Sequence, residues 1–333
     1  MSRLRLADIA EMANVSTSTV SKVPNGHSDV GPATRAKVEK ILTDCGYQKS
    51  LLNPTSSKQI EIVFEDFEEQ WAMELLQGAV RTLEKRGISV TITELRKREK
   101  ADSSWIQDIL ERRPIGVILV FSDLTDKDKD QFASRKIPYI TVDPAGDPAP
   151  NSITIRADNW TGELIATRHL IALGHQRIGI ITGPIRQLCA KARLDGFLTA
   201  LDEANIKRDT NLIRHDRFTV EGGFQQAVSL LSLDNPPTAI LAGNDLQALG
   251  IYDAARRHHL SIPDDLSVIG LGDVMFSRYL SPALTTVQQP LNAMAGRAAE
   301  MLLTLSNNES VPQSTVFPTN LVVRNSTAPP PNK

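Results

Sequence analysis

Apolar positions near the start of the chain follow the spacing of one helical face, at Leu6, Ile9, Ala10 and Ala13. The pattern stops at Asn14, and asparagine tolerates the left-handed backbone that a sharp corner needs. Ser16 can cap the next helix through its hydroxyl, and we expect that helix to begin at about Thr17 and to end at Pro24. The pattern therefore predicts two short helices around a tight corner.

A third short helix is predicted within VGPATRAKVEKILTDCGY, with Pro32 in its first turn and Gly46 as its stop. The inward positions are Val20 and Val23 on the second helix and Val38, Ile41 and Leu42 on the third. The second helix carries short polar side chains between its buried positions. This arrangement is typical of a helix-turn-helix, whose second helix enters the DNA major groove.

The rest of the chain alternates between β-branched apolar runs and helical stretches. The predicted strands are 60–64, 88–94, 115–121, 138–142, 177–182, 238–243 and 266–271. Helical patterns such as 71–87 and 162–174 lie between them. Short apolar runs spaced by helices indicate parallel sheets that are buried on both faces. We therefore predict an α/β body of two doubly wound lobes, with a ligand in the cleft beyond the strand ends.

Charge divides the chain unevenly, although the net charge of the 333 residues is only −2. Residues 1–58 hold eight Lys or Arg and five Asp or Glu, a net charge of +3, so the remainder carries −5. A basic module on an acidic body suggests a nucleic-acid contact within the first sixty residues. No apolar run is long enough to span a bilayer and no secretory signal is evident, so we expect a cytoplasmic protein.

The sequence offers no arrangement typical of an enzyme. Cys45 and Cys189 are too few for a disulfide framework, and the six histidines show no metal spacing. No dinucleotide fingerprint follows a strand. We expect no catalytic residue, no metal and no cofactor.

At this point a family resemblance becomes specific. The segments LADIAEMANVSTSTVSKVPNG and TRAKVEKILTDCGY resemble the headpiece of the lactose-repressor (LacI/GalR) family of bacterial transcription regulators. DNWTGELIATRHLIALGHQRIGIITG and SPALTTVQQP are similar to segments of the family's periplasmic-binding-protein-like body. The resemblance extends to about residue 325.

The resemblance implies a division of the chain into four parts. These are a helix-turn-helix domain (1–48), a linker (49–59), a body (60–325) and a disordered tail (326–333). Within the body, the N-lobe would comprise about 60–158 and 289–318, and the C-lobe about 159–288 and 319–325.

The DNA contacts are carried over from the family position by position. The residues expected to face operator bases are Thr17, Ser18 and Lys22. Those expected near phosphates are Thr19, Ser21, Asn25 and Thr34, with Ser16 at the start of the same helix. In the family the linker forms a helix that inserts a leucine into the DNA minor groove, a role open here to Leu51 or Leu52.

Three cleft residues are expected from their places in the predicted elements. Trp71 opens the helix after the first body strand, where an aromatic ring can stack on the C–H surface of a sugar. Asp143 and Asn244 follow strands and can hydrogen-bond hydroxyl groups, although Asn244 can instead cap the following helix. Core packing is the alternative for Trp71.

The resemblance adds further effector residues. Arg193 matches an arginine that grips the effector, and Phe218 matches an aromatic residue of the same pocket, with core packing as the alternative. Gln187 and Cys189 lie in the loop that leads to Arg193.

Two departures from the family bear on mechanism. The family has two acidic residues after the strand at 266–271, the first of which contacts the effector. This chain has Gly272 there and Asp273 in the second place, so either Asp273 replaces the missing contact or the contact is absent. The linker is also about four residues shorter than the common one and contains Pro54, which would end a helix early.

We therefore expect a transcription repressor of carbohydrate genes that binds double-stranded operator DNA as a homodimer or tetramer and is released by a sugar. Similarity to actinobacterial regulators of plant-polysaccharide use favours a pentose or a xylo-oligosaccharide. A corepressor system with a purine remains open. A sugar-uptake protein would lack the headpiece, and a sugar-modifying enzyme would need a nucleophile or metal site that is not evident.

Overall fold

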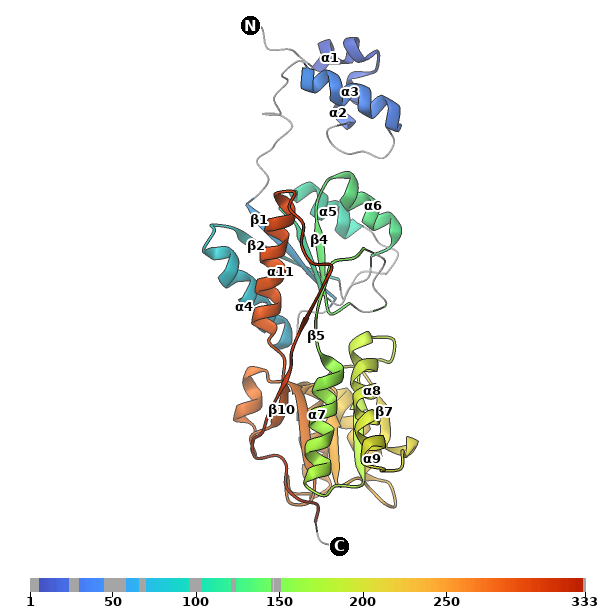
Figure 1. Cartoon of the computed structure of the whole chain (residues 1–333), viewed down its shortest axis with the longest axis vertical. Coiled ribbons are helices and arrows are strands. Elements are labelled where there is room, and N and C mark those ends of the chain that lie inside the picture. The colour runs from blue at the N-terminus through green and yellow to red at the C-terminus, as the bar shows by residue number, and fades with distance from the viewer. Residues whose placement is uncertain are drawn as a thin grey trace.

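The fold is taken from a computed structural model. It describes residues 6–23, 30–44, 58–65, 70–95, 104–120, 124–144, 146 and 151–331. The N-terminal headpiece comprises helices α1 (Leu6–Ala13), α2 (Thr17–Lys22) and α3 (Pro32–Asp44). Figure 1 shows it beyond the end of an elongated two-lobed body.

The headpiece folds around a small apolar core that includes Ile9, Val20 and Val38, all completely buried. Asn14 has a φ of 53°, which confirms the left-handed corner between α1 and α2. Pro32 is the first residue of α3, as predicted. The predicted stops, Pro24 and Gly46, lie outside the described residues.

The N-lobe is built on a six-stranded parallel sheet in the order β11-β5-β4-β3-β1-β2. Its strands are β1 (Gln59–Phe64), β2 (Ser89–Glu94), β3 (Val117–Val120), β4 (Tyr139–Val142), β5 (Thr154–Ala157) and β11 (Ser314–Phe317). One face packs against α4 (Gln70–Glu84) and α11 (Leu291–Ser306). The other packs against α5 (Ser104–Arg112) and α6 (Asp126–Ser134).

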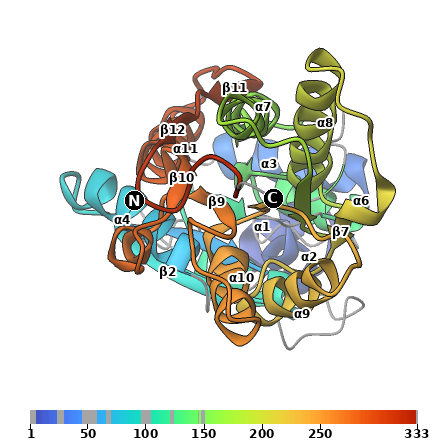
Figure 2. The same ribbon diagram turned by 90° about the horizontal axis from the view of Figure 1, so that it is seen from below.

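The C-lobe repeats this plan with the strand order β12-β10-β9-β8-β6-β7. Its strands are β6 (Ile178–Thr182), β7 (Ile213–His215), β8 (Ala239–Ala242), β9 (Ser267–Gly272), β10 (Thr285–Gln288) and the antiparallel β12 (Asn320–Val322). Helices α7 (Asn159–Ala172) and α8 (Leu188–Glu203) cover one face, and α9 (Val220–Leu231) and α10 (Asp245–Arg257) the other (Figure 2). Two short 3-10 helices, η1 (Thr210–Leu212) and η2 (Met275–Tyr279), complete the lobe.

The chain passes between the two sheets three times. It crosses after β5, again between β10 and α11, and finally between β11 and β12. The C-terminal ends of the strands in each lobe therefore face the other lobe, where a doubly wound sheet binds its ligand. The predicted α/β architecture, a helix-turn-helix headpiece on a two-lobed body, is confirmed.

All seven predicted strands are present to within a few residues in their described parts. The sequence analysis missed five strands: β5, β7, β10, β11 and β12. Each has only three or four residues, and each contains at least one polar residue, as in STVF of β11. Such segments lack the apolar run that identifies a central strand.

The prediction that residues 326–333 form a disordered tail is wrong for the described part, 326–331. Ser326 is fully buried, donates a hydrogen bond to the carbonyl of Val268 and accepts one from the amide of Thr285. The amide of Ala328 donates to Ser267 Oγ. The proline-rich composition suggested disorder, but these hydrogen bonds hold the tail against strands β9 and β10 of the C-lobe.

Candidate functional site

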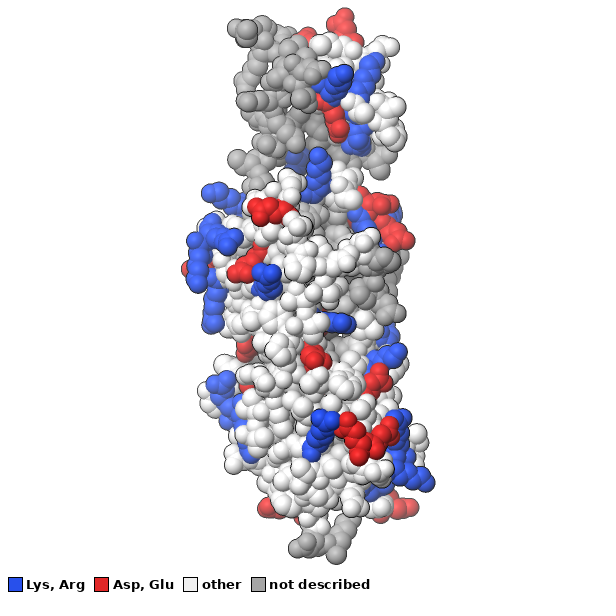
Figure 3. Space-filling model, viewed as in Figure 1, with Lys and Arg blue, Asp and Glu red and all other residues white. Residues whose placement is uncertain are grey.

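The start of α2 carries the side chains expected to read DNA bases. Thr17 and Ser18 are exposed there, and Lys22 is half-buried at the other end of the helix. Lys and Arg side chains face outward on the described part of the headpiece (Figure 3). The helix therefore presents the polar surface that a major-groove contact requires.

Ser16 has a structural role at the same place. Its Oγ accepts a hydrogen bond from the amide of Thr19 at 3.1 Å and lies 2.7 Å from Ser18 Oγ. Ser16 is thus the N-cap of α2, as its position predicted.

The other predicted DNA contacts are distributed over the headpiece and linker. Ser21 is exposed and Thr34 is half-buried near the start of α3. Arg35 Nη1 donates to the carbonyl of Val23, which ties α3 to the end of α2. Asn25, Leu51 and Leu52 lie outside the described residues.

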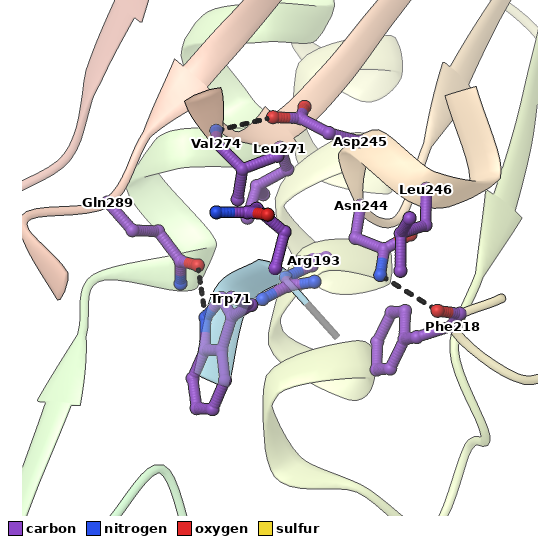
Figure 4. A pocket seen from close by; sticks show the side chains of 10 residues that line it. Trp71, Arg193, Phe218, Asn244, Asp245, Leu246, Leu271, Val274 and Gln289 are labelled. Carbon is purple, nitrogen blue, oxygen red and sulfur yellow. Dashed lines mark hydrogen bonds between the residues drawn. The ribbon is translucent and has the colours of Figure 1, made fainter. Parts of the chain in front are cut away.

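A cavity between the lobes, called cavity A here, brings together four of the predicted effector residues. Trp71 enters it from α4 of the N-lobe, and Arg193, Phe218 and Asn244 enter from the C-lobe (Figure 4). The remaining lining residues are Gln70, Asp245, Leu246, Leu271, Val274 and Gln289. Its volume is about 30 Å³, enough for one or two waters, so a larger ligand requires the lobes or the lining side chains to move.

Arg193 is a buried cation at the centre of this site, with 4% of its surface exposed. Its Nε and Nη2 donate to Asn159 Oδ1 at 2.9 and 2.8 Å, and Nη1 donates to the carbonyl of Gly243. The guanidinium carbon lies 5.2 Å from the centre of the Phe218 ring. Arg193 is therefore held in place by neutral acceptors and an aromatic face.

A chain of hydrogen bonds connects the N-lobe to Arg193. Trp71 Nε1 donates to Gln289 Oε1, and Gln289 Nε2 donates to Asn159 Oδ1, each at 3.3 Å. Asn159 in turn accepts from Arg193. The sequence analysis missed Gln289 and Asn159 as site residues. Each of the two residues lies at an expected crossing between the lobes, and that position was the signal in the sequence that could have identified them.

Asn244 lines cavity A and also caps α10. Its Oδ1 accepts from the amide of Gln247 at 2.8 Å, and its Nδ2 donates to the carbonyl of Phe218 at 3.0 Å. The capping alternative is therefore correct, and the same side chain positions the Phe218 backbone.

Asp245 faces cavity A but is engaged within the C-lobe. Its Oδ2 accepts from the amide of Val274 and from Ser277 Oγ, and its Oδ1 accepts from Thr286 Oγ1, at 2.6 to 2.9 Å. Burial raises the pKa of Asp245, and these hydrogen bonds oppose the rise. The residue joins the start of α10 to the loop after β9.

Asp273 does not line cavity A, nor the second interlobe cavity described below. It forms an ion pair with Arg324 at 2.5 Å and accepts from Gln288 Nε2 at 2.9 Å. Gly272 has a φ of +135°, a backbone conformation that disfavours any residue with a Cβ. The loop thus directs its acidic side chain away from Arg193, so the suggestion that Asp273 replaces the missing contact lacks structural support.

A second interlobe cavity, cavity B, contains two further predicted residues, Asp143 and Cys189, and has a volume of about 240 Å³. Asp143 Oδ2 has no hydrogen-bond partner among the described residues, and burial raises the pKa of this carboxyl to about 6. Burial also raises the pKa of the Cys189 thiol to about 11. Gln187 precedes α8 and makes no capping bond through its side chain.

Glu163 on α7 is a buried acid that the sequence analysis missed. Only 2% of its surface is exposed, and Oε1 has no partner among the described residues. Burial raises its pKa to about 8, and the charge of Arg193 opposes that rise. Glu163 follows Asn159 by one helical turn, so both belong to the face of α7 that meets α8.

Two negative findings apply to the described residues. No group of three or more His, Cys, Asp or Glu there is arranged to hold a metal ion. None of the helices in that part of the chain combines the length and the apolar character that membrane crossing needs.

Comparisons with known proteins agree with this geometry. Residues 5–50 match the model of bacterial regulatory proteins of the lacI family, and residues 167–327 match a periplasmic binding protein-like domain. The chain is 30% identical over 328 residues to the HTH-type transcriptional repressor PurR of Actinobacillus pleuropneumoniae, covering 96% of this chain and 97% of that one.

Two solved structures extend the likeness to the whole molecule. The transcriptional regulator CelR in complex with cellobiose has a TM-score of 0.75 at 27% identity, over 97% of this chain and all of that one. The lac repressor dimer bound to operator and the anti-inducer ONPF has a TM-score of 0.73 at 28% identity, over 98% of this chain and all of that one. The chain therefore belongs to the LacI family of bacterial regulatory proteins, as a DNA-binding transcriptional repressor with a ligand-binding body and not an enzyme.

Proposed function

We propose that this repressor controls carbohydrate-utilisation genes in the cytoplasm and that a small sugar bound between its lobes releases it from the operator. Ligand binding at this position would couple to DNA binding if the lobes move to admit the ligand. A ligand shifts such an equilibrium only by its difference in affinity between the two states.

One observation supports the sugar most directly. In cavity A the ring of Trp71 from one lobe lies opposite Arg193, Phe218 and Asn244 from the other. Aromatic faces pack on the C–H surfaces of sugar rings, while guanidinium and amide groups hydrogen-bond hydroxyls. A sugar at this place would contact both lobes at once. A pentose or a xylo-oligosaccharide is the first class to test.

Pairing of two bodies is supported by exposed apolar side chains on one side of the molecule. Met73 and Val80 on α4 and Ile92 on β2 are each more than a third exposed, and Tyr279 on η2 is 75% exposed. Figures 1 and 2 place α4, β2 and the orange segment that contains η2 on the same side. Scattered single residues of this kind are ordinary, but a set that spans both lobes suits a homodimer interface.

A purine-like corepressor is the second candidate. Half of the residues that line cavity A are aromatic or apolar, and its one lining carboxylate, Asp245, is engaged within the C-lobe. A flat heterocycle fits between two aromatic rings as well as a sugar does.

Isothermal calorimetry on the full chain distinguishes the candidates. We expect a pentose or its β-linked dimer to bind to the wild-type protein and a purine base not to bind. Tight binding of the base alone would favour the corepressor, and binding of neither class would contradict both proposals.

Two tryptophan variants locate the site within the cleft. Trp71→Ala should weaken sugar binding by up to about tenfold, since a stacked aromatic ring contributes roughly 0.5–1.5 kcal/mol. Trp160→Ala, at the mouth of cavity B and 40% exposed, is the matched control and should retain binding. The reverse result would place the sugar in cavity B.

A further inference from the structure

Basic side chains occupy the turns at one edge of the N-lobe sheet. These turns connect α4 to β2, α5 to β3 and α6 to β4, and one further basic residue precedes β1. The residues are Lys58, Lys85, Arg86, Arg113, Arg135 and Lys136. No Asp or Glu lies in residues 85–88, 113–116 or 135–138. We call these six residues the basic edge.

The basic edge forms a continuous row. Strands β4, β3, β1 and β2 are neighbours in the parallel sheet, so their N-terminal ends lie at the same edge, spaced about 4.8 Å apart. Four strands therefore carry six positive charges along roughly 15 Å. Burial and then repulsion from Arg113 lower the pKa of Arg135, and the charge of Glu111 opposes this shift, so Arg135 lies near one basic and one acidic side chain.

The C-lobe shows that the fold alone does not require this charge. Basic residues are favourable near any helix C-terminus because of the helix dipole, and the same turns recur in the C-lobe. The turns before β6, β7, β8 and β9 nevertheless contain three Lys or Arg and four Asp or Glu. Arg177 is paired there with Asp209 at 2.9 Å, and Arg208 is paired with Asp202.

Four of the six side chains of the basic edge are available to a partner. Lys58, Lys85, Arg86 and Lys136 are exposed, and none forms an ion pair with another described residue. Glu309, in the turn before β11, carries a negative charge at the far end of the same sheet.

The basic edge lies on the side of the body that carries the headpiece. The chain from the headpiece enters the body at Lys58, immediately before β1, and therefore at the N-terminal edge of the sheet. Figure 1 shows the headpiece beyond this edge, and Figure 3 shows Lys and Arg side chains, together with some Asp and Glu, on the neighbouring part of the N-lobe. DNA held by the headpiece consequently lies on the same side of the body.

We propose that the basic edge binds the phosphate backbone of the DNA that flanks the operator. The partner is double-stranded DNA of any sequence, because phosphates carry no sequence information. The N-lobe then adds affinity without specificity, and a movement of the lobes alters this contact together with the headpiece.

The salt dependence of DNA binding tests the proposal. The variant Lys85→Gln/Arg86→Gln/Lys136→Gln is compared with wild type on a random-sequence duplex of about 40 base pairs, and each lost phosphate contact should lower the slope of log K against log salt by about 0.9. We expect the magnitude of the slope to fall by roughly 2 to 3 for each subunit that contacts the duplex, and the affinity to be at least tenfold weaker at low salt. An unchanged slope would overturn the proposal.

Two controls separate this contact from the others. Lys207→Gln changes an exposed lysine in the equivalent turn of the C-lobe and should leave the slope unchanged. A fall of about one third of that in the triple variant, in proportion to the one charge removed, would mean that net charge alone is responsible and would overturn the proposal. Unchanged thermal midpoints would show that all variants fold.

Duplex length gives an independent test. Wild type should bind a duplex of about 40 base pairs more tightly than one of about 18, which is close to the span of two operator half-sites. The triple variant should lose this difference and keep the affinity of wild type for the short duplex. If wild type shows no length dependence beyond that of the triple variant, the basic edge does not contact flanking DNA.

Discussion

At the residue scale, Arg193 and Glu163 illustrate how burial shapes the cleft. Arg193 has only neutral hydrogen-bond acceptors, and the two nearby acids, Glu163 and Asp143, have pKa values raised by burial. A buried charge is costly unless hydrogen bonds compensate it, and the bonds to Asn159 and Gly243 supply that compensation for Arg193.

Glu163→Gln should remove a pH dependence of stability. The pKa of Glu163 is higher in the folded chain, about 8, than its ordinary value of 4.5, so the stability that the protonated acid contributes is lost as pH rises between these values. Asp143, at about 6, acts in the same direction at lower pH. Between pH 6 and 8 wild type should therefore lose on the order of 2 kcal/mol more than the variant. Urea unfolding at several pH values measures this, and parallel curves would contradict it.

Exchanging Thr17, Ser18 and Lys22 together should change operator preference. The first two are exposed at the start of α2, where base-edge contacts contribute about 1–3 kcal/mol of discrimination each. Selection of binding sites from a random DNA library reads the preference directly. Ser16→Ala is the control, since loss of the cap should weaken binding without altering the preferred sequence. An unchanged preference in the triple variant would place base reading elsewhere.

Among single residues, four that were expected in the cleft, from their place in an element or from the family resemblance, come together in the structure, and their contact with an effector stays a prediction. Trp71, Arg193, Phe218 and Asn244 all line cavity A. Sequence reasoning failed for Asn159, Gln289 and Glu163, because hydrogen bonds across a lobe crossing and buried acids on a helix face leave no local pattern.

At the element scale, the wall of cavity A depends on the close crossing of α9 and α10. A Cβ on Gly223 would lie 2.2 Å from the backbone oxygen of Gln247, so the helices approach at glycine. The side chain of Gln247 in turn bonds the backbone of Arg217 and Gly243. The crossing thus fixes the segments that carry Phe218 and Asn244.

The long apolar elements were predictable from the sequence, whereas the five short strands that complete the sheets were not.

Gly223→Ala should lower both stability and effector affinity. Overpacking of this kind costs about 1–3 kcal/mol, and separation of the helices would displace Phe218 and Asn244. Gln225→Ala, at an exposed position on the same helix, should change neither. Thermal unfolding and calorimetry measure the two effects. Full stability in Gly223→Ala would show that the helices separate without cost.

At the scale of the whole molecule, three chain crossings and one hydrogen-bond chain connect the lobes. The chain from Trp71 through Gln289 and Asn159 to Arg193 spans the cleft, and two of its members lie at crossings. A ligand that displaces any of these bonds alters how the lobes are held together. Alternation of strands and helices predicted two lobes, but the contacts across the cleft depend on tertiary packing and could not be predicted from the sequence.

The most direct test of an effector-controlled repressor is fluorescence-detected binding to DNA from the protein's own upstream region, with and without a panel of sugars. One sugar should weaken operator binding by wild type about 5- to 150-fold, the usual range for allosteric coupling. Arg193→Ala should bind the operator as tightly as wild type and show no response to the sugar. Operator binding by wild type that no sugar weakens, or its loss in Arg193→Ala, would contradict the account.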